Sequence, residues 1–146
     1  MTAVAQIIDS KPDKNVYRIA PAASVFDAVK LMAEKSIGAV LVMEGETVVG
    51  IITERDYARK IVLMMRSSTD TLVRDVMTSQ VLFVERHQTS NECMALMTES
   101  RLRHLPVMDD GKLIGLVSIG DLVKDVISEQ QFTIEQLQHY IAGNRG

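Results

Sequence analysis

Cysteine, proline and aromatic residues are all scarce in this chain of 146 residues, which has one cysteine, three prolines, three tyrosines, three phenylalanines and no tryptophan. The single cysteine, Cys93, cannot form an internal disulfide, so a disulfide-stabilised fold is excluded and a reducing compartment is favoured. Cys93 stands among the apolar residues of "TSNECMALMTES", and we interpret it as a buried structural thiol rather than a nucleophile. The nine methionines take over part of the packing that aromatic side chains usually provide.

Long apolar runs and blocks of basic charge are also missing. No stretch approaches the roughly 18 consecutive apolar residues of a membrane span, and the first residues, "MTAVAQIIDSKPDK", lack the basic start and apolar stretch of a signal peptide. The net charge of −3 argues against nucleic acid as the main partner. Because 47% of the residues are hydrophobic and 24% are charged, the chain can bury a core. We expect a folded cytoplasmic protein that binds neither membrane nor nucleic acid.

A phrase of the sequence is written twice. "GIITERDYARK" begins at Gly50 and "GLVSIGDLVKD" begins at Gly115, and each reads glycine, two aliphatic residues, a hydroxyl residue, two variable positions and aspartate. The shift in numbering that takes Gly50 to Gly115 also takes Asp56 to Asp121. This repeat shift aligns, without a gap, everything from Ser24 in the first copy to the phrase. Self-similarity at a fixed period indicates a tandem duplication.

Each repeat predicts the order strand, helix, strand, strand, helix, which is an α+β fold. Short strands are expected at 16–19 and 81–84. A helix should follow in each repeat, opened at Ser24 and at Thr89, because each of these hydroxyl residues has an acid three positions later, the capping-box pattern. A hairpin of two strands comes next in each repeat, and the duplicated phrase then leads from a strand into a second helix.

The repeats divide the chain along its length. We place the first repeat at 8–70, the second at 74–130 and a C-terminal helix or tail at 131–146. In the last segment Thr133 and Gln136 form another capping-box pattern, which predicts a separate closing helix.

The hydroxyl and acid of each phrase admit two interpretations. Thr53 and Asp56, like Ser118 and Asp121, stand where a strand ends and a helix begins, so both pairs can be capping boxes and no more. A helix N-terminus also attracts anions, and the cationic stretch 101–106, "RLRHLP", begins the strand beside the second phrase. Carboxylates that accept from ribose hydroxyls, near cationic donors for phosphate, would form a nucleotide site. The residues alone leave both interpretations open.

In its element order and its repeated phrase the chain resembles a pair of cystathionine-β-synthase (CBS) domains over nearly its whole length. The resemblance implies a fold in which the two repeats pack by pseudo-two-fold symmetry into one module. It also implies two clefts that bind adenosine-containing ligands such as AMP, ATP, NAD or NADH, and S-adenosylmethionine, without a metal.

The resemblance assigns roles to individual residues. The aspartates Asp56 and Asp121 would hold ribose hydroxyls, while Thr53 and Ser118 would contact ribose or phosphate. Backbone groups beside the adenine would come from Gly38, Ala39, His104 and Leu105, and phosphate would meet Arg55 and Arg103.

The two copies differ where phosphate would bind. Arg55 precedes the first aspartate, whereas Gly120 precedes the second, so we expect ligands with more phosphate to favour the first cleft. Arg103 and His104 replace Gly38 and Ala39 of the first copy. His104 has two readings that stay open: a phosphate-contacting histidine, or a neutral strand residue that packs against its neighbours.

No catalytic constellation is recognisable in the sequence: there is no metal-ligand spacing, nucleophile elbow or glycine-rich phosphate loop. We therefore expect no enzyme but a regulatory sensor of adenosine nucleotides that acts in signal transduction on a separate, unknown partner protein. The alternative is a ligand-independent dimerisation or interaction module, and a nucleotide-consuming enzyme is a third reading. A homodimer is expected, with apolar faces rich in methionine as its candidate surface and packing in the core as the alternative: Met32, Met64, Met65, Met94 and Met97.

Overall fold

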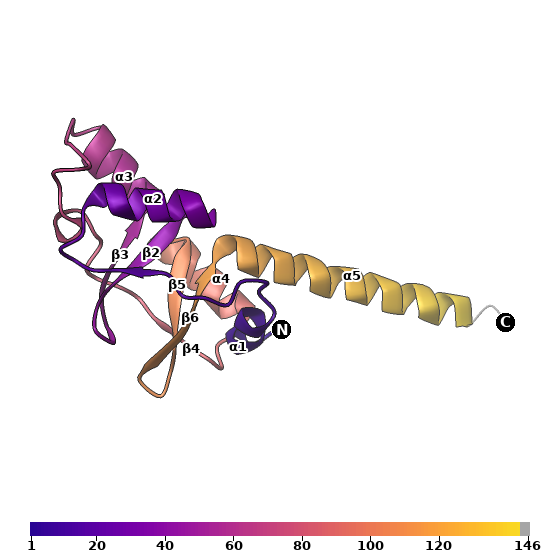
Figure 1. The fold of residues 1–146 in the computed structure, drawn as a ribbon. Helices are drawn as coiled ribbons and strands as arrows, with labels where there is room; N and C mark the ends of the chain where they lie inside the picture. The colour runs from indigo at the N-terminus through magenta and orange to yellow at the C-terminus, as the bar shows by residue number, and fades with distance from the viewer. Residues whose placement is uncertain (144–146) are drawn as a thin grey trace. The chain divides into compact units, whose positions relative to one another are not determined.

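The computed structural model describes residues 1–143, and its secondary structure repeats along the chain (Figure 1). Two three-stranded sheets, with strand orders β1-β2-β3 and β4-β5-β6, combine with helices as the predicted α+β fold requires. The elements before the second sheet are α1 (Val4–Asp9), β1 (Arg18–Ile19), α2 (Val25–Lys35), β2 (Ala39–Glu44), β3 (Thr47–Thr53), α3 (Glu54–Tyr57), the π-helix η1 (Ala58–Val62) and the 3-10 helix η2 (Val73–Asp75). They are followed by β4 (Val84–Glu85), α4 (Ser90–Ser100), β5 (His104–Asp109), β6 (Lys112–Ser118) and α5 (Ile119–Gly143).

The two sheets have the same register after the repeat shift. In each, a parallel pair of strands is followed by an antiparallel hairpin. Ala39 lies opposite Thr53, as His104 lies opposite Ser118, and a bulge follows Val42 just as another follows its counterpart in β5. Both hairpins therefore end on the hydroxyl residue of the duplicated phrase.

The helices α2 and α4 begin and end in equivalent ways. The Ser24 hydroxyl accepts a hydrogen bond from the Asp27 N–H, and Thr89 forms the full reciprocal capping box with its acid. Each helix ends at a residue in the left-handed conformation, Ser36 with φ 55° and Arg101 with φ 56°. Neither is a glycine, although glycine adopts this conformation at the lowest cost.

Each sheet has its own hydrophobic core. Cys93 is fully buried in the core of the second sheet, and burial, followed by the charge of Glu92, raises the pKa of its thiol to about 11. This confirms the structural role predicted for it. Met32 and Met97 are also buried, one in each core, so for these two methionines core packing holds and they leave the candidate dimerisation surface.

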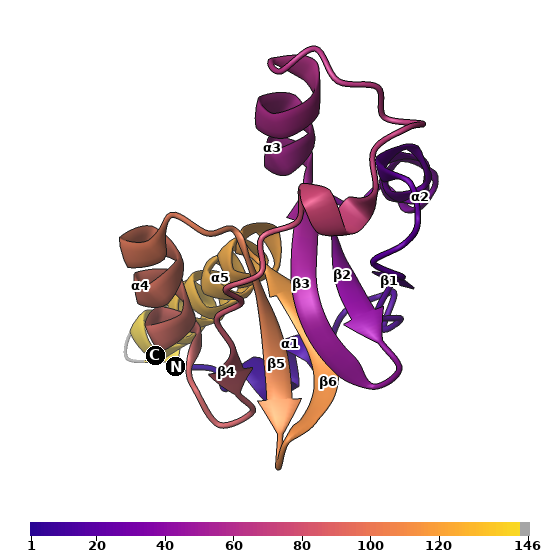
Figure 2. The same cartoon turned by 90° about the vertical axis from the view of Figure 1, so that its left-hand side faces the viewer.

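The compact units of the structure do not coincide with the repeats. The segment that precedes each repeat, here called its lead segment, belongs to the unit of the other repeat. One unit comprises residues 15–82, and the other comprises 1–14 together with 83–146. In the first unit Thr78 makes a two-way backbone pairing with Ile51 of β3. In the second, α1 lies against β6 (Figure 2). Each sheet is thus completed by the segment that introduces the other repeat.

The glycines of the duplicated phrase make these contacts possible. A Cβ atom at Gly50 would lie 2.5 Å from the Met77 sulfur and 3.0 Å from the Thr78 carbonyl oxygen. A Cβ atom at Gly115 would lie 2.7 Å from a methyl carbon of Ile8. A lead segment approaches each glycine so closely that a side chain would not fit, which explains why glycine stands at both positions.

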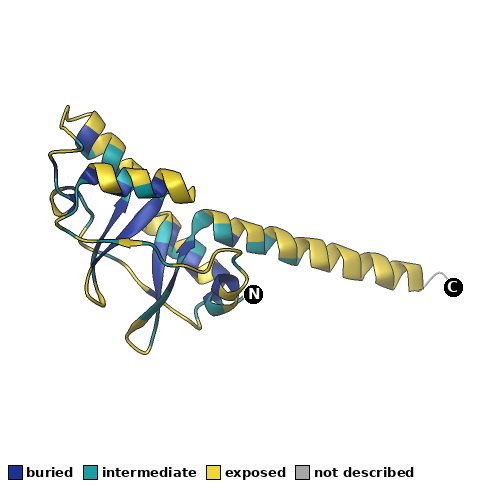
Figure 3. Cartoon of the chain, viewed as in Figure 1, coloured by how far each residue is buried: buried dark blue, intermediate teal, exposed yellow. Residues whose placement is uncertain are grey.

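The helix that follows the phrase differs most between the repeats. In the first repeat α3 passes into the π-helix η1, whereas α5 continues without interruption to Gly143. The predicted separate helix start at Thr133 is wrong, because the Thr133 hydroxyl donates to the Glu129 carbonyl oxygen inside α5. Residues 130–143 are all exposed (Figure 3).

Candidate functional site

The first phrase folds into a capping box around a buried carboxylate. The Thr53 hydroxyl oxygen accepts from the Asp56 N–H at 3.1 Å, and the Asp56 Oδ2 accepts from the Thr53 N–H at 3.0 Å. The other carboxylate oxygen, Oδ1, lies 3.0 Å from the Lys60 ammonium and 3.3 Å from the Thr78 hydroxyl. Lys60 also donates to the Val76 carbonyl oxygen at 2.8 Å. Asp56 thus ties the helix start to the lead segment 76–78, and both of its oxygens are engaged.

The second phrase builds the same box with a different cation. The Asp121 Oδ2 accepts from the Ser118 N–H at 2.9 Å, and the Ser118 hydroxyl oxygen accepts from the Asp121 N–H at 3.1 Å. Lys11, from the segment after α1, lies 2.9 Å from the same Oδ2 and donates to the Leu116 carbonyl oxygen. Burial by itself would raise the pKa of Asp121, but the hydrogen bonds from Ser118 and the charge and hydrogen bond of Lys11 outweigh it and lower the pKa below its usual value.

The two lysines that pair with these carboxylates, Lys60 and Lys11, were not predicted from the sequence. Lys60 stands four residues after Asp56, a spacing at which helical side chains meet, so the pattern was available. Its counterpart after the repeat shift is Asp125, which has the opposite charge. Lys11 and its partner Asp121 lie near opposite ends of the sequence, and no local pattern indicates the contact.

The structure brings each predicted base-binding segment to the start of the matching helix. The Gly38 carbonyl oxygen accepts from the Glu54 N–H, and the Arg103 carbonyl oxygen accepts from the Ile119 N–H. Ala39 and Leu105 are buried, so their side chains belong to the core and only backbone groups could face a ligand. Arg55 and the Arg103 side chain are exposed.

His104 is neutral at pH 7. Burial is the largest effect and lowers its pKa to about 4; nearby Asp121 raises it, while Lys11 and Arg103 lower it further. Of the two readings, this favours the neutral strand residue, and the positive charges that act on it are those of Lys11 and Arg103.

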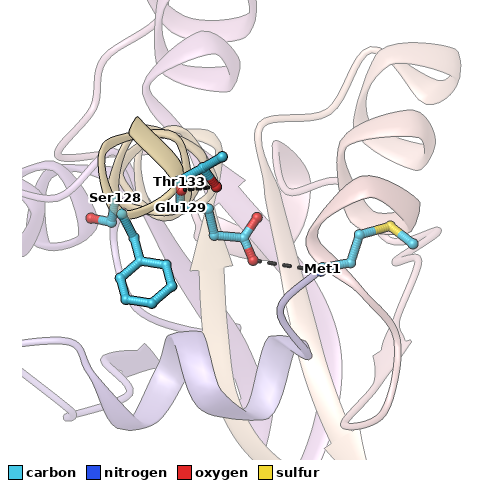
Figure 4. A pocket seen from close by; sticks show the side chains of 5 residues that line it. Met1, Ser128, Glu129 and Thr133 are labelled. Atoms are coloured by element: carbon cyan, nitrogen blue, oxygen red, sulfur yellow. Dashed lines mark hydrogen bonds and ion pairs between the residues drawn. The ribbon is translucent and has the colours of Figure 1, made fainter. Parts of the chain in front are cut away.

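A surface hollow of about 440 Å³ lies elsewhere, on α5 beside the first residues of the chain (Figure 4). Met1, Ser128, Glu129, Phe132 and Thr133 line it, and the Met1 ammonium lies 3.7 Å from Glu129. None of these residues belongs to either phrase. Within residues 1–143 no cluster of three or more metal-ligating side chains occurs, and no helix in that part of the chain is long and apolar enough to cross a membrane.

Comparisons with known proteins agree with this architecture. The family model of the CBS domain matches residues 4–63 and again residues 73–128. The CBS domain-containing protein CBSX3, mitochondrial, of Arabidopsis thaliana is 43% identical over 82% of this chain, and the chain spans 61% of that protein's length.

Two solved structures extend the comparison. A protein of Burkholderia ambifaria MC40-6 with CBS domains, described as a proposed signal-transduction protein, is 61% identical, has a TM-score of 0.86, and matches over 91% of this chain and 99% of its own. A hexameric CBS-CP12 protein from bloom-forming cyanobacteria is 26% identical with a TM-score of 0.75, over 84% of this chain and 66% of that one. With a duplicated fold, a duplicated phrase and two family matches, the chain belongs to the CBS-domain family as a tandem CBS pair.

Proposed function

We propose that the chain is a cytoplasmic regulatory sensor that binds an adenosine nucleotide, AMP, ATP or NAD/NADH, and acts on a separate partner protein. The observation that carries this proposal is the repeated placement of a carboxylate, a hydroxyl and a lysine at the start of a helix, once around Asp56 and once around Asp121. A carboxylate can accept from ribose hydroxyls, and the N–H groups and positive end of a helix favour phosphate. Family membership makes this ligand class the natural one to test.

The ribose role must compete with the capping role. A carboxylate offers about four acceptor positions. Asp56 already contacts Thr53, Thr78 and Lys60, and its side chain is 9% exposed. We propose Asp121 as the better ribose acceptor, because its contacts with Ser118 and Lys11 fall on one oxygen and its side chain is 16% exposed. The contacts thus favour the second phrase, whereas Arg55 alone would have favoured the first.

Calorimetric titration with AMP, ATP, NAD and NADH tests the proposal on the wild type and three variants. Asp121→Asn removes the charged acceptor and should weaken binding roughly ten- to a hundredfold. Asp56→Asn should lower the free energy of unfolding without ligand by about 1–3 kcal/mol, because Lys60 loses its charged partner, and should weaken binding less. Asp110→Asn is the matched control: it makes the same charge change in an exposed turn with φ 50°, which asparagine tolerates.

Two results would reject these assignments. If none of the four nucleotides binds the wild type at millimolar concentration, the sensor function is wrong and the alternative, a ligand-independent dimerisation or interaction module, is favoured. If the nucleotide binds but Asp121→Asn binds it as tightly as Asp110→Asn does, the carboxylate is a helix cap and no ribose ligand. Turnover of a bound nucleotide would instead support an enzyme.

We also propose that the chain forms a homodimer, since closed two-fold association is the commonest arrangement of soluble oligomers. The hexameric state in the description of the cyanobacterial relative supports self-association within the family.

A further inference from the structure

Helix α5 has an apolar stripe on its surface, formed by Val123, Ile127, Ile134, Leu137 and Ile141. These side chains are between 43% and 59% exposed. Their spacings of four, seven, three and four residues are those of the a and d positions of a heptad repeat. At about 100° per residue, all five fall within a sector of about 80° around the helix axis.

The packing of α5 on its own unit does not account for this stripe. The buried side of the helix is marked by Leu122, which is fully buried and points about 100° away from the middle of the stripe. Val123 and Ile127 remain exposed even where α5 packs against the fold. Beyond that point residues 130–143 are exposed on every side, and Figures 1 and 3 show α5 continuing past its own sheet. The stripe therefore extends over both a packed half and an unpacked half of the helix.

The properties of the stripe favour another helix of the same kind as its partner. A strict heptad spacing suits a helix that winds around a second helix with the same period. In the unpacked half the flanking positions are Gln131, Thr133, Gln138 and Tyr140, so like charges would not meet when two copies pair. Residues 125–143 contain no lysine or arginine, whereas a helix that binds a lipid surface usually has basic residues beside its apolar face.

Gln130 interrupts the stripe at its centre. It occupies a d position of the heptad frame and is exposed. A single polar residue at such a position sets the register between paired helices at a cost in stability. This is a property of helices that pair with a defined partner, and two copies of α5 would supply it to each other.

We propose that this stripe is the surface through which two copies of the chain associate, as a pair of α5 helices. The inference rests on the homodimer proposed above and gives it a site, but it does not depend on nucleotide binding. The exposed apolar residues that follow η1, Leu63, Met64 and Met65, are the competing surface within the chain.

Sedimentation equilibrium at micromolar concentration tests the proposal with substitutions that preserve helix propensity. Ile134→Gln with Leu137→Gln removes apolar side chains from the stripe and should raise the dimer dissociation constant at least roughly 100-fold. Phe132→Gln is the matched control: Phe132 is 63% exposed and points away from the stripe, so this variant should dimerise as the wild type does. Gln130→Leu should tighten the dimer, because it completes the apolar stripe.

The possible results distinguish a wrong dimer surface from the absence of a dimer. A monomeric wild type overturns both the homodimer and this inference, and leaves the stripe to a different partner. A dimer that survives the double substitution overturns the stripe alone and points to residues 63–65. If Phe132→Gln weakens the dimer as much as the double substitution does, the stripe is also overturned as the dimer surface. Nucleotide titration of the double variant should match the wild type, since no substituted residue lies near either phrase.

Discussion

Lowering the pH from 7 to 5 should destabilise the protein through His104. In the folded chain its pKa is about 4, lowered from 6.5 chiefly by burial. Between those two values the unfolded chain binds a proton that the folded chain does not. Stability contributed by the neutral imidazole is therefore fully present above about pH 6.5 and falls as the pH falls toward 4.

The size of the effect follows from the two pKa values. Linkage gives a loss of about 2 kcal/mol in the free energy of unfolding between pH 7 and pH 5. That is a large share of the roughly 5–15 kcal/mol that stabilises a typical domain. Asp121 does not contribute in this window: its folded pKa is lowered, so its stabilising effect is present above about pH 4 and is lost only as the pH falls through the folded value.

Urea denaturation at pH 7, 6 and 5 measures the loss directly. In His104→Gln the side chain no longer titrates, so the decline should be about 2 kcal/mol smaller than in the wild type. His87→Gln is the matched control and should keep the wild-type decline, because His87 is exposed in the folded and the unfolded chain alike. An equal decline in the wild type and His104→Gln would refute the burial argument, as would direct observation by NMR of His104 titrating near pH 6.5.

Two further predictions concern backbone positions, and thermal or urea unfolding measures both. Gly50→Ala should lower the free energy of unfolding by about 1–3 kcal/mol, because the Met77 side chain can shift but the Thr78 carbonyl is fixed by its pairing with β3. The control is Gly120→Ala, whose Cβ would meet nothing closer than 3.6 Å and which should be neutral or stabilising. Equal losses of stability in both variants would contradict the clash at Gly50. Ser36→Gly should raise the free energy of unfolding by up to about 1 kcal/mol, because φ is 55° there, and a lower stability would show that the serine side chain contributes more than its backbone strain costs.

The duplication explains why the sheets could be predicted from sequence. Hydrophobic alternation and turn residues are local signals, and a second copy at a fixed shift confirms each of them. The strand that begins at Ala39 pairs with β3, and the strand that begins at His104 pairs with β6, as the predicted hairpins require. The hydroxyl and acid of each phrase also form the predicted capping boxes, since capping depends on residues only three positions apart.

Contacts between distant segments could not be predicted in this way. Nothing near Lys11 in the sequence indicates Asp121 as its partner, because the exchange of lead segments is decided by packing. The failure at Thr133 has a different origin. Its capping-box pattern is real, but a threonine hydroxyl inside a helix can donate to the carbonyl four residues earlier, so the pattern alone does not mark a helix start.

The exchange of lead segments also orders the assembly of the chain during its synthesis. Residues 15–82 contain every part of their own unit and can close as soon as they are made. The other unit is made of two separate segments: Ile8 precedes residues 15–82 in the chain, whereas Gly115, the position it packs against, follows them. While residues 15–82 are being made, α1 therefore lacks β6, the strand against which it packs in the folded unit. The unit that contains α1 is therefore completed after the other unit, although α1 precedes the whole of that unit in the chain.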